Sequence, residues 1–427
     1  MMLGILMGVL FLCLFLTIPI AISLAIATVA VFFVEFPGQP MINNLAQAML
    51  VSADSFPLMA IPFFMLMGSL MEKTGLAKRL VNIAEVTTEG KPGGLGMTVI
   101  VATLFFSTVS GSGPATAAAI GGIMIPAMAL QGYRKTYSVG LVSASSTIGP
   151  VTPPSIPLIM YGVTVGVSVT QLFIAGIVPG LMMALGLMFY NYFISKKRDY
   201  RGIAVSRMPE EKKKIYIEGI AAVLMPVVVL GGIYGGVFTP TESAVVGVVY
   251  TIIFGLIVKE LTIGRFTDAM VGAAVTASTV MILFGPATTF GRLLTLGRIP
   301  EQITVFMTGL TDNGLIILLL SNLVIIVIGM FIDTISAIVL LAPLFAPLLI
   351  SLGYDPIYVG IIIVVNLCIG MITPPLSANM FVAMRIGGTK FEETLKETFP
   401  MLLILFAVLV IMILFPPIVT FLPNLMG

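Results

Sequence analysis

The sequence predicts an all-α polytopic membrane protein built from an inverted structural repeat, with two re-entrant helical hairpins and two broken helices. Composition gives the first indication: 58% of the 427 residues are hydrophobic, only 9% are charged, and the mean hydropathy is +1.14. Soluble domains carry about 25% charged residues, so this chain cannot cover a water-facing surface. The second indication is an internal repeat with one constant offset. The third is a pair of apolar runs that are too long for a single membrane crossing.

The repeat relates positions 221 residues apart over most of the chain, without gaps. The pairs at this offset include Pro19 and Pro240, Gly132 and Gly353, and the Thr-Pro-Pro segments 152–154 and 373–375. In a hydrophobic chain such repeats are typical of secondary transporters, whose binding sites lie at Gly/Pro-interrupted segments in matching places of the two halves. We therefore expect a first inverted repeat over 1–195, a linker over 196–215 and a second repeat over 216–427.

Ten apolar runs fit membrane-spanning helices, which need about 20 apolar residues each. These runs are 2–17, 19–36, 44–71, 137–166, 172–195, 216–236, 241–258, 267–290, 356–384 and 397–423. The runs within 1–71 and 216–290 are expected to form a scaffold. Residues 2–36 could instead form one long kinked helix, because only Pro19 separates the first two runs.

Two further runs, 96–130 and 314–350, have Gly, Ser or Asp at their middle. A helical hairpin that enters the membrane and returns fits both the length and the break. Non-helical backbone at membrane depth is tolerated only where it is buried in protein or faces water, so the hairpin tips should lie inside the protein. Segments 73–90 and 297–312, which precede the hairpins, mix charged and apolar residues and are predicted to be amphipathic arm helices at the membrane interface.

Basic residues predict the orientation, because cytoplasmic loops are enriched in Lys and Arg. The interval 196–214 holds eight of the 21 basic residues, so the linker is predicted to be cytoplasmic. Counting crossings outward from it places both termini outside. The two hairpins then open to opposite faces, which makes the two halves inverted relative to each other.

The two broken helices, within 137–166 and 356–384, are the main candidates for chemistry. Adjacent prolines remove backbone donors and unwind the helix. The freed carbonyls can replace the water shell of a cation, and half-helix N-termini favour an anion. A simple kink is the alternative. The carbonyl candidates for Na⁺ are Gly149, Val151, Pro153, Gly370, Ile372 and Pro374, and the substrate candidates are Thr152, Ser155, Thr373 and Ser377.

The hairpin tips offer further oxygen ligands, which are Ser110, Ser112, Asp333 and Thr334. Oxygen ligands with one carboxylate suit a small hard cation such as Na⁺, and an intramembrane carboxylate is usually functional. Packing of small residues between helices is the alternative for the serines. Arg292 is a candidate partner for a substrate carboxylate, although its head group could instead snorkel to the interface.

Enzymatic activity is not expected. The chain has no histidine and no G-x-x-x-x-G-K-[ST] phosphate loop, which removes the commonest general base and any ATP-driven step. No cofactor is expected besides Na⁺ as a coupling ion, and no nucleic acid is expected as a partner.

Several long motifs carry a family resemblance: GSGPATAAAIGGIMIPAM (111–128), STIGPVTPPS (146–155), GGIYGGVFTPTESA (231–244) and GMITPPLSANMFVA (370–383). They resemble the large membrane subunit of tripartite ATP-independent periplasmic (TRAP) transporters, over essentially the whole chain. The resemblance implies a multi-pass protein of the bacterial inner membrane. It also implies an elevator-type transport domain on a scaffold, as in the ion transporter superfamily. It places ion sites at the first hairpin tip with 147–153 and at Asp333 with 370–374.

The resemblance further implies Na⁺-driven uptake of an organic acid, typically sialic acid, a C4-dicarboxylate or a sugar acid. The implied partners are a small four-helix membrane subunit and a periplasmic substrate-binding protein. Two alternatives stay open at this point. One is a stand-alone Na⁺/carboxylate symporter without a binding protein, and the other is an ion channel.

Overall fold

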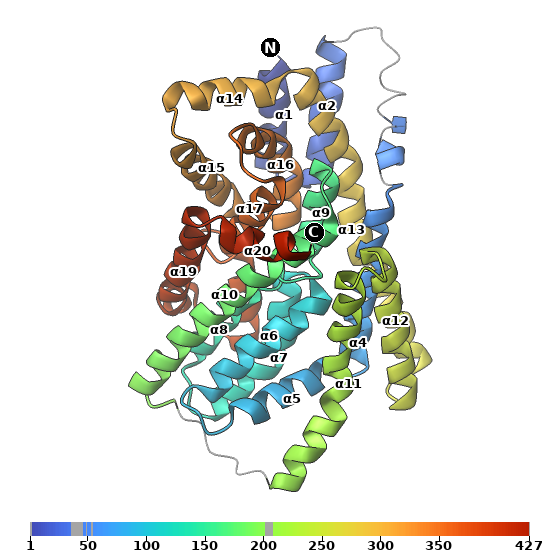
Figure 1. Ribbon diagram of the computed structural model, residues 1–427, viewed down its shortest axis with the longest axis vertical. Coiled ribbons are helices and arrows are strands. Elements are labelled where there is room, and N and C mark those ends of the chain that lie inside the picture. Colours follow the sequence, from blue (N-terminus) through green and yellow to red (C-terminus); the bar gives the residue numbers. More distant parts are fainter. Residues whose placement is uncertain (1, 36–45, 48, 53, 201–207, 427) are drawn as a thin grey trace.

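The computed structural model describes residues 2–35, 46–47, 49–52, 54–200 and 208–426, without the side chains of 107–110. Every element bounded in these ranges is a helix, and eight of the helices are long and apolar enough to span a membrane (Figure 1). The prediction of an all-α polytopic protein is therefore confirmed.

The helices of the first half are α1 (Met2–Phe15), α2 (Ile20–Glu35), the 3₁₀ helix η1 (Phe56–Met59), α4 (Ala60–Lys73), α5 (Leu76–Thr88), α6 (Gly94–Ser110), α7 (Gly113–Leu130), α8 (Lys135–Ser146), α9 (Ile156–Val165) and α10 (Val169–Lys197). Those of the second half are α11 (Pro209–Tyr234), α12 (Pro240–Ile257), α13 (Ile263–Leu296), α14 (Ile299–Leu310), α15 (Gly314–Gly329), α16 (Thr334–Ser351), α17 (Pro356–Gly370), α18 (Ala378–Gly387), α19 (Phe391–Leu414) and α20 (Pro417–Met426).

The structure decides between the alternatives at the N-terminus and corrects the next span. Residues 2–35 form two helices, because the chain turns at Thr17, which has a φ of 60°. The expected span 44–71 is not one helix. Asp54 and Ser55 are not helical, and Pro57 lies in the first turn of the 3₁₀ helix that leads into α4. Proline is favoured in a first turn, since its missing N–H has no partner to lose there.

Two expectations further along the chain were also wrong. The span 397–423 is two helices, because Phe415 precedes two prolines and leaves the helical conformation (φ −127°). The linker is shorter than 196–215, since α10 continues to Lys197 and α11 begins at Pro209. Hydropathy finds only the apolar part of a helix, whereas the charged first turns of α11 are helical as well.

The helices pack in two groups. In one, α13 packs on α2 and α4, α12 packs on α4 and α11, and α1 packs on α2. In the other, α6–α10 and α15–α20 surround the interrupted segments. Two short helices bridge the groups: α5 contacts α6 and α11, and α14 contacts α13 and α16. Figure 1 shows α5 and α14 near opposite ends of the long axis, where two arm helices of an inverted pair would lie.

The same turn ends α7 and α16, at the repeat offset. In each, a glycine with positive φ lets the N–H of the following tyrosine reach the carbonyl five residues back, a common helix C-terminal motif. The glycines are Gly132 (φ 83°) and Gly353 (φ 90°), and the bonds run from Tyr133 N to Met128 O (3.1 Å) and from Tyr354 N to Leu349 O (3.2 Å). The internal repeat is thus matched in backbone geometry.

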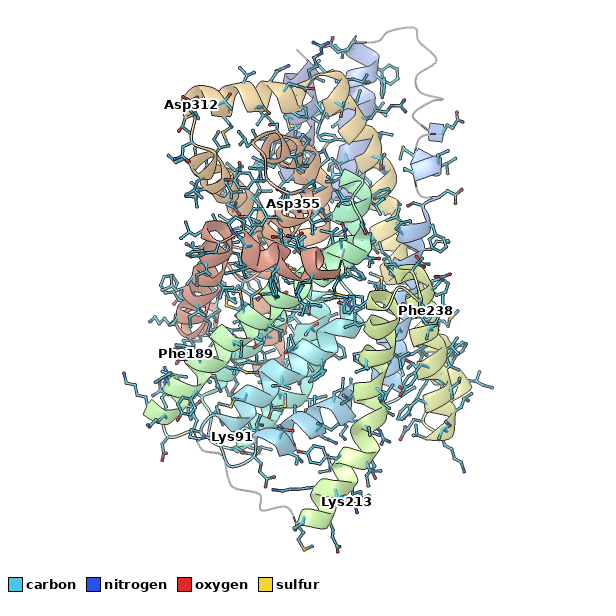
Figure 2. All side chains as sticks on the ribbon, viewed as in Figure 1. Lys91, Phe189, Lys213, Phe238, Asp312 and Asp355 are labelled. Atoms are coloured by element: carbon cyan, nitrogen blue, oxygen red, sulfur yellow. The ribbon has the colours of Figure 1, made fainter. Side chains whose placement is uncertain are left out.

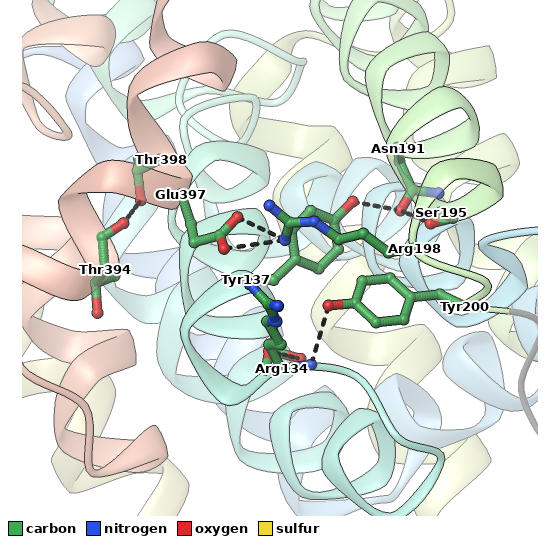
Figure 3. A network of polar contacts seen from close by, with 10 residues as sticks. Arg134, Tyr137, Asn191, Ser195, Arg198, Tyr200, Thr394, Glu397 and Thr398 are labelled. Carbon is green, nitrogen blue, oxygen red and sulfur yellow. Dashed lines mark hydrogen bonds and ion pairs between the residues drawn. The ribbon is translucent and has the colours of Figure 1, made fainter.

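The segment after α10 begins in a polar cluster, the linker clamp, made of Tyr133, Tyr137, Arg198, Tyr200 and Glu397. Figure 3 labels all of these residues except Tyr133. Arg198 Nη1 donates to both carboxylate oxygens of Glu397 on α19, at 2.9 and 2.8 Å, and its guanidinium lies over the Tyr137 ring. The Tyr200 ring stacks on Tyr133. The chain therefore leaves α10 fixed to α8 and α19.

The orientation of the molecule can be tested at its two ends. Figure 2 places Lys91 and Lys213 at one end and Asp312 at the other. With a cytoplasmic linker, an impermeant thiol reagent applied to intact cells should label Asp312→Cys at once and Lys213→Cys only after permeabilisation. The native Cys13 and Cys368 are buried and give a low background. Labelling of both variants in intact cells would contradict the predicted orientation.

Candidate functional site

The first broken helix is interrupted between α8 and α9. Residues 147–155 form turns there, and Ser155 begins α9: its hydroxyl accepts from Leu158 N (3.2 Å) and donates to Pro150 O. Two glycines of α10 make room for the interruption. A Cβ at Gly176 would lie 2.6 Å from Val151 O, and one at Gly180 would lie 2.2 Å from Thr152 Cγ2. The close approach of α10 thus holds these turns inside the protein, as backbone freed at membrane depth requires.

The second broken helix repeats this geometry at the offset of 221 residues. α17 ends at Gly370, α18 starts at Ala378, and both interruptions contain a cis Pro-Pro bond. The two threonines of the Thr-Pro-Pro motifs make equivalent bonds, each to the carbonyl four residues back. These are Thr152 Oγ1 to Ile148 O (3.0 Å) and Thr373 Oγ1 to Ile369 O (2.8 Å). Both hydroxyls therefore serve to shape the turn, which gives the predicted substrate residues Thr152 and Thr373 a structural role.

The tip of the α6–α7 hairpin lies between the two interruptions. Gly111 has a φ of 55°, and a Cβ there would lie 3.2 Å from Ile156 N and 3.4 Å from Pro154 O of the first broken helix. A Cβ at Gly113 would lie 2.8 Å from both amide atoms of Asn379 in the second. Ser112, between these glycines, is the N-cap residue of α7. The predicted ion ligand Ser112 is thus placed between the two broken helices, while the side chain of Ser110 lies outside the described part.

The hairpins and broken helices also pack crosswise. α7 contacts α8 of its own half and α18 of the other, and α16 contacts α17 of its own half and α9 of the other. At the second tip, the end of α15 touches the end of α17, since a Cβ at Gly370 would lie 2.7 Å from the carbonyl carbon of Gly329. The repeat therefore brings four segments from distant parts of the chain together.

The predicted carbonyl ligands have unequal surroundings. Gly149 O accepts from Thr152 Oγ1 (3.4 Å), and Gly370 O accepts from Thr373 N (3.0 Å). No donor among the described groups reaches the carbonyl oxygens of the other candidates, which are Val151, Pro153, Ile372 and Pro374. Backbone oxygens left open in this way are suited to a cation.

Asp333 is exposed, and it caps α16: one carboxylate oxygen accepts from Ile335 N and from Ser336 N, both at 3.1 Å. A carboxylate at a helix N-terminus is stabilising by itself, so the structure gives Asp333 a structural role. The adjacent Thr334 is buried, and its hydroxyl lies beside the thiol of Cys368 without an oxygen or nitrogen partner in the described chain. Ion binding at this tip stays a prediction.

Of the remaining substrate candidates, Ser377 lies in the site and Arg292 does not. Ser377 is buried at the start of α18, and its hydroxyl has no partner among the described residues. Arg292 lies on α13 in the other helix group, where it lines a cavity with none of the other predicted site residues. Sequence reasoning could not separate these cases, because it gives no contacts between α13 and the broken helices.

Three residues that the sequence reasoning missed have buried oxygens or nitrogens with no partner in the described chain. Ser145 and Asn366 are equivalent in the repeat, are almost fully buried, and leave Oγ and Oδ1 unpaired just before each interruption. Asn379 is 0% exposed, and both its amide atoms are unpaired. The constant offset of the repeat could have indicated Ser145 and Asn366, because it pairs one with the other. It gives no such indication for Asn379, which it pairs with the apolar Leu158.

A transition metal would have no site in the described ranges, where no three His, Cys, Asp or Glu side chains gather. Among the described residues, the arrangement offers neutral oxygens, the carboxylate of Asp333 and helix ends, which suit a hard monovalent cation and an organic anion.

Comparison with known proteins identifies the family of this chain. The family model "Tripartite ATP-independent periplasmic transporter, DctM component" matches residues 7–418. The chain belongs to this family. The resemblance to TRAP transporters is therefore confirmed, and the DctM family protein is a transporter permease rather than an enzyme. It is a multi-pass protein of the bacterial inner membrane.

Two similar relatives differ in length. The chain is 43% identical over 385 residues to the "Isethionate TRAP transporter permease protein DctMQ" of Oleidesulfovibrio alaskensis, covering 90% of this chain and 61% of that protein. It is 36% identical over 398 residues to the "Sialic acid TRAP transporter large permease protein SiaM" of Vibrio cholerae, covering 93% of each.

A solved structure shares the fold. It is the Alcanivorax borkumensis YdaH transporter, with a TM-score of 0.66 at 16% identity, covering 88% of this chain and 87% of that one. The fold of this DctM family member is thus that of a known membrane transporter.

The unpaired amide of Asn379 leads to a prediction. A buried polar group without a partner costs about 1–3 kcal/mol, so Asn379→Ala should leave the melting temperature of the purified protein nearly unchanged while uptake falls at least tenfold. Asn191→Ala is the matched control. Asn191 is also 0% exposed, but it accepts from Tyr137 and donates to Gly93 O, so its loss should lower the melting temperature by several degrees. Equal destabilisation by both changes would show that Asn379 is an ordinary packing residue.

Proposed function

We propose that this DctM family protein is the large membrane subunit of a transporter that uses a Na⁺ gradient to take up an organic acid. One observation carries the proposal. The buried, unpaired oxygens of Ser145 and Asn366 are equivalent in the repeat; Ser145 lies one residue before the end of α8 and Asn366 four residues before the end of α17. Repeat-related oxygens without donors support two similar cation sites.

The ligands proposed for these sites combine side-chain oxygens, those of Ser145 and Asn366 among them, with backbone carbonyls, of which those of Gly149 and Gly370 already accept one hydrogen bond. The first site would use Ser110, Ser112, Gly149, Val151 and Pro153. The second would use Asp333, Thr334, Gly370, Ile372 and Pro374. Support comes from the contact of Gly111 with Pro154 and Ile156, which brings the first tip to the first interruption, and from the contact of Gly329 with Gly370 at the second.

The substrate is proposed to lie beside the first hairpin tip, near Ser377 and Asn379. α7 and α18 both begin here, since Gly113 meets Asn379. Two helix N-termini favour the acid group of an organic anion, and the amide can bond to a carboxylate or a hydroxyl. Thr152, Ser155 and Thr373 would shape this site through their bonds to the backbone. Sialic acid, a C4-dicarboxylate, a sugar acid or isethionate are the proposed substrate candidates, the last because of the relative at 43% identity.

An elevator-type motion is the proposed mechanism. The group containing the hairpins would move against the group of α1, α2, α4, α11, α12 and α13. The arms α5 and α14 support this division, since each bridges both groups at opposite ends of the molecule. The proposed partners are a small four-helix membrane subunit and a periplasmic substrate-binding protein, as a tripartite family implies.

Uptake measurements can distinguish two alternatives from this proposal. A stand-alone Na⁺/carboxylate symporter would transport without a binding protein, and a channel would show flux that does not saturate and is not coupled to Na⁺. No observation in the structure favours either over the tripartite transporter.

The test of this function is uptake by proteoliposomes that contain the complete complex. Isethionate, N-acetylneuraminate and succinate would be offered in turn, with a binding protein and an inward Na⁺ gradient. We expect saturable uptake of one of them that disappears when K⁺ replaces Na⁺. Uptake at the same rate without Na⁺, or without the binding protein, would exclude the proposed mechanism.

A substitution at Asp333 can separate the effect of its charge on Na⁺ binding from its role as an N-cap residue in this uptake assay. Asn is also a good N-cap residue, so Asp333→Asn should keep the protein folded while it removes the carboxylate charge. If Asp333 binds Na⁺, the Na⁺ concentration for half-maximal uptake should rise at least threefold. Asp355→Asn is a matched control, because Asp355 caps α17 with the same two backbone bonds. Unchanged Na⁺ dependence in Asp333→Asn would leave this residue with its capping role alone.

A further inference from the structure

A cavity of about 440 Å³ lies between the two helix groups, apart from the hairpin tips. Its walls are α13 on one side and α16 with the end of α9 on the other. The two groups come close at its edge, where a Cβ at Gly291 would lie 3.6 Å from Pro343. Figure 1 shows α9, α16 and the end of α13 toward the end of the molecule that carries α14. A cavity of this size can hold a small organic molecule.

Arg292 is the one charged side chain among the described residues that line the cavity. No carboxylate pairs with it within the described chain. Thr288, Thr295 and Thr164 also line the cavity. The hydroxyls of the first two donate to carbonyls of α13, whereas that of Thr164 is buried without a partner in the described ranges. Thr288, Arg292 and Thr295 follow one another at helical spacing on one face of α13.

Two other cavities provide a contrast. One, of about 430 Å³, lies where α9 meets η1 and α12, and another, of about 380 Å³, is bordered by α6, α10 and α11. Neither has a charged side chain in its wall. The second is lined almost wholly by apolar residues, although it reaches Thr152 and Pro153. Of the three cavities, the one that contains Arg292 thus offers a cationic group to an anion.

The depth of Arg292 fits an entrance rather than a central site. It lies four residues before the end of α13 at Leu296, which is about 6 Å along a helix. Arginine keeps its charge in proteins and binds carboxylates and sulfonates through its planar set of donors. An unpaired guanidinium inside a cavity wall thus has an open binding capacity for an acid group.

We propose that this cavity is an entrance subsite, in which Arg292 and Thr164 receive the acid group of the organic anion before the anion reaches the hairpin tips. This inference rests on the proposed function, because it concerns the route of the same substrate. The subsite is shared between the groups: Arg292 belongs to α13, and Thr164 belongs to α9. A relative movement of the groups would separate the two residues and release the anion inward.

The test measures charge in the cavity and binding of the anion separately. Thr288→Cys places a thiol one turn from Arg292, at an exposed position on the same helix face. In the reconstituted complex, its rates of reaction with an anionic and a cationic methanethiosulfonate are compared. Adding Arg292→Gln should lower the ratio of anionic to cationic rates about 3- to 10-fold, since one charge at roughly 6 Å in water changes each rate about threefold. Arg298→Gln is the control, because Arg298 is exposed at the same end but does not line the cavity.

Anion binding is then tested by protection of the introduced thiol. Isethionate, N-acetylneuraminate or succinate, whichever the unmodified complex transports, should slow the reaction at least threefold. The protection should disappear with Arg292→Gln and persist with Arg298→Gln. In uptake, Arg292→Gln should raise KM at least fivefold with little change in kcat.

The outcomes separate the two proposals. If none of the three anions is transported by the unmodified complex, these three substrates are excluded, and an unchanged thiol ratio with Arg292→Gln would still overturn the entrance subsite. If uptake occurs but Arg292→Gln changes neither the ratio nor the protection, the entrance subsite is wrong. A changed ratio without protection would also overturn it, because the cavity would then attract anions without holding the substrate.

Discussion

A helix that is interrupted inside a membrane frees N–H and C=O groups that lipid cannot satisfy. Both broken helices of this structure must satisfy that constraint, and much of the packing around them does so. Gly176 and Gly180 let α10 approach the first interruption, and the contact of Gly329 with Gly370 covers the second. Thr152 and Thr373 each return a hydroxyl to a carbonyl one turn back. The groups left unpaired after this accommodation are those that a transported ion or substrate can use.

The repeat explains how much of this could be predicted. A constant offset in the sequence predicted that the two halves break in equivalent places, and the matching turns after α7 and α16 agree with it. Helix ends were less predictable. Hydropathy did not predict the charged start of α11 or the break at Phe415. Charged residues and prolines do not by themselves show whether a helix ends where the apolar run does.

The site was predictable only where it depends on backbone. The interruptions follow from the prolines, whereas the roles of single side chains follow from contacts between segments far apart in the chain. Asp333 was expected as a buried carboxylate but caps α16 from an exposed position. Arg292 was expected beside the substrate site but lies on the other helix group. Asn379 became a candidate only through its contact with Gly113, which is more than 260 residues away in the sequence.

The departures from the repeat are as informative as the matches. Ser145 and Asn366 preserve an unpaired oxygen at equivalent positions, as two similar ion sites would require. Asn379 corresponds to Leu158, so one half has a buried amide where the other has an apolar side chain. An asymmetric organic acid that binds between two related halves must contact them differently, because its acid group can face only one of them. The linker clamp is asymmetric as well, since it fixes the chain after α10 to α8 and α19, and also to Gly93 just before α6, whose N–H donates to Tyr200 O (2.8 Å). Because α13 packs directly on α16, and α4 on α6, the two helix groups are joined by more than the arms, whereas the interrupted helices with their unpaired oxygens belong to one packed group.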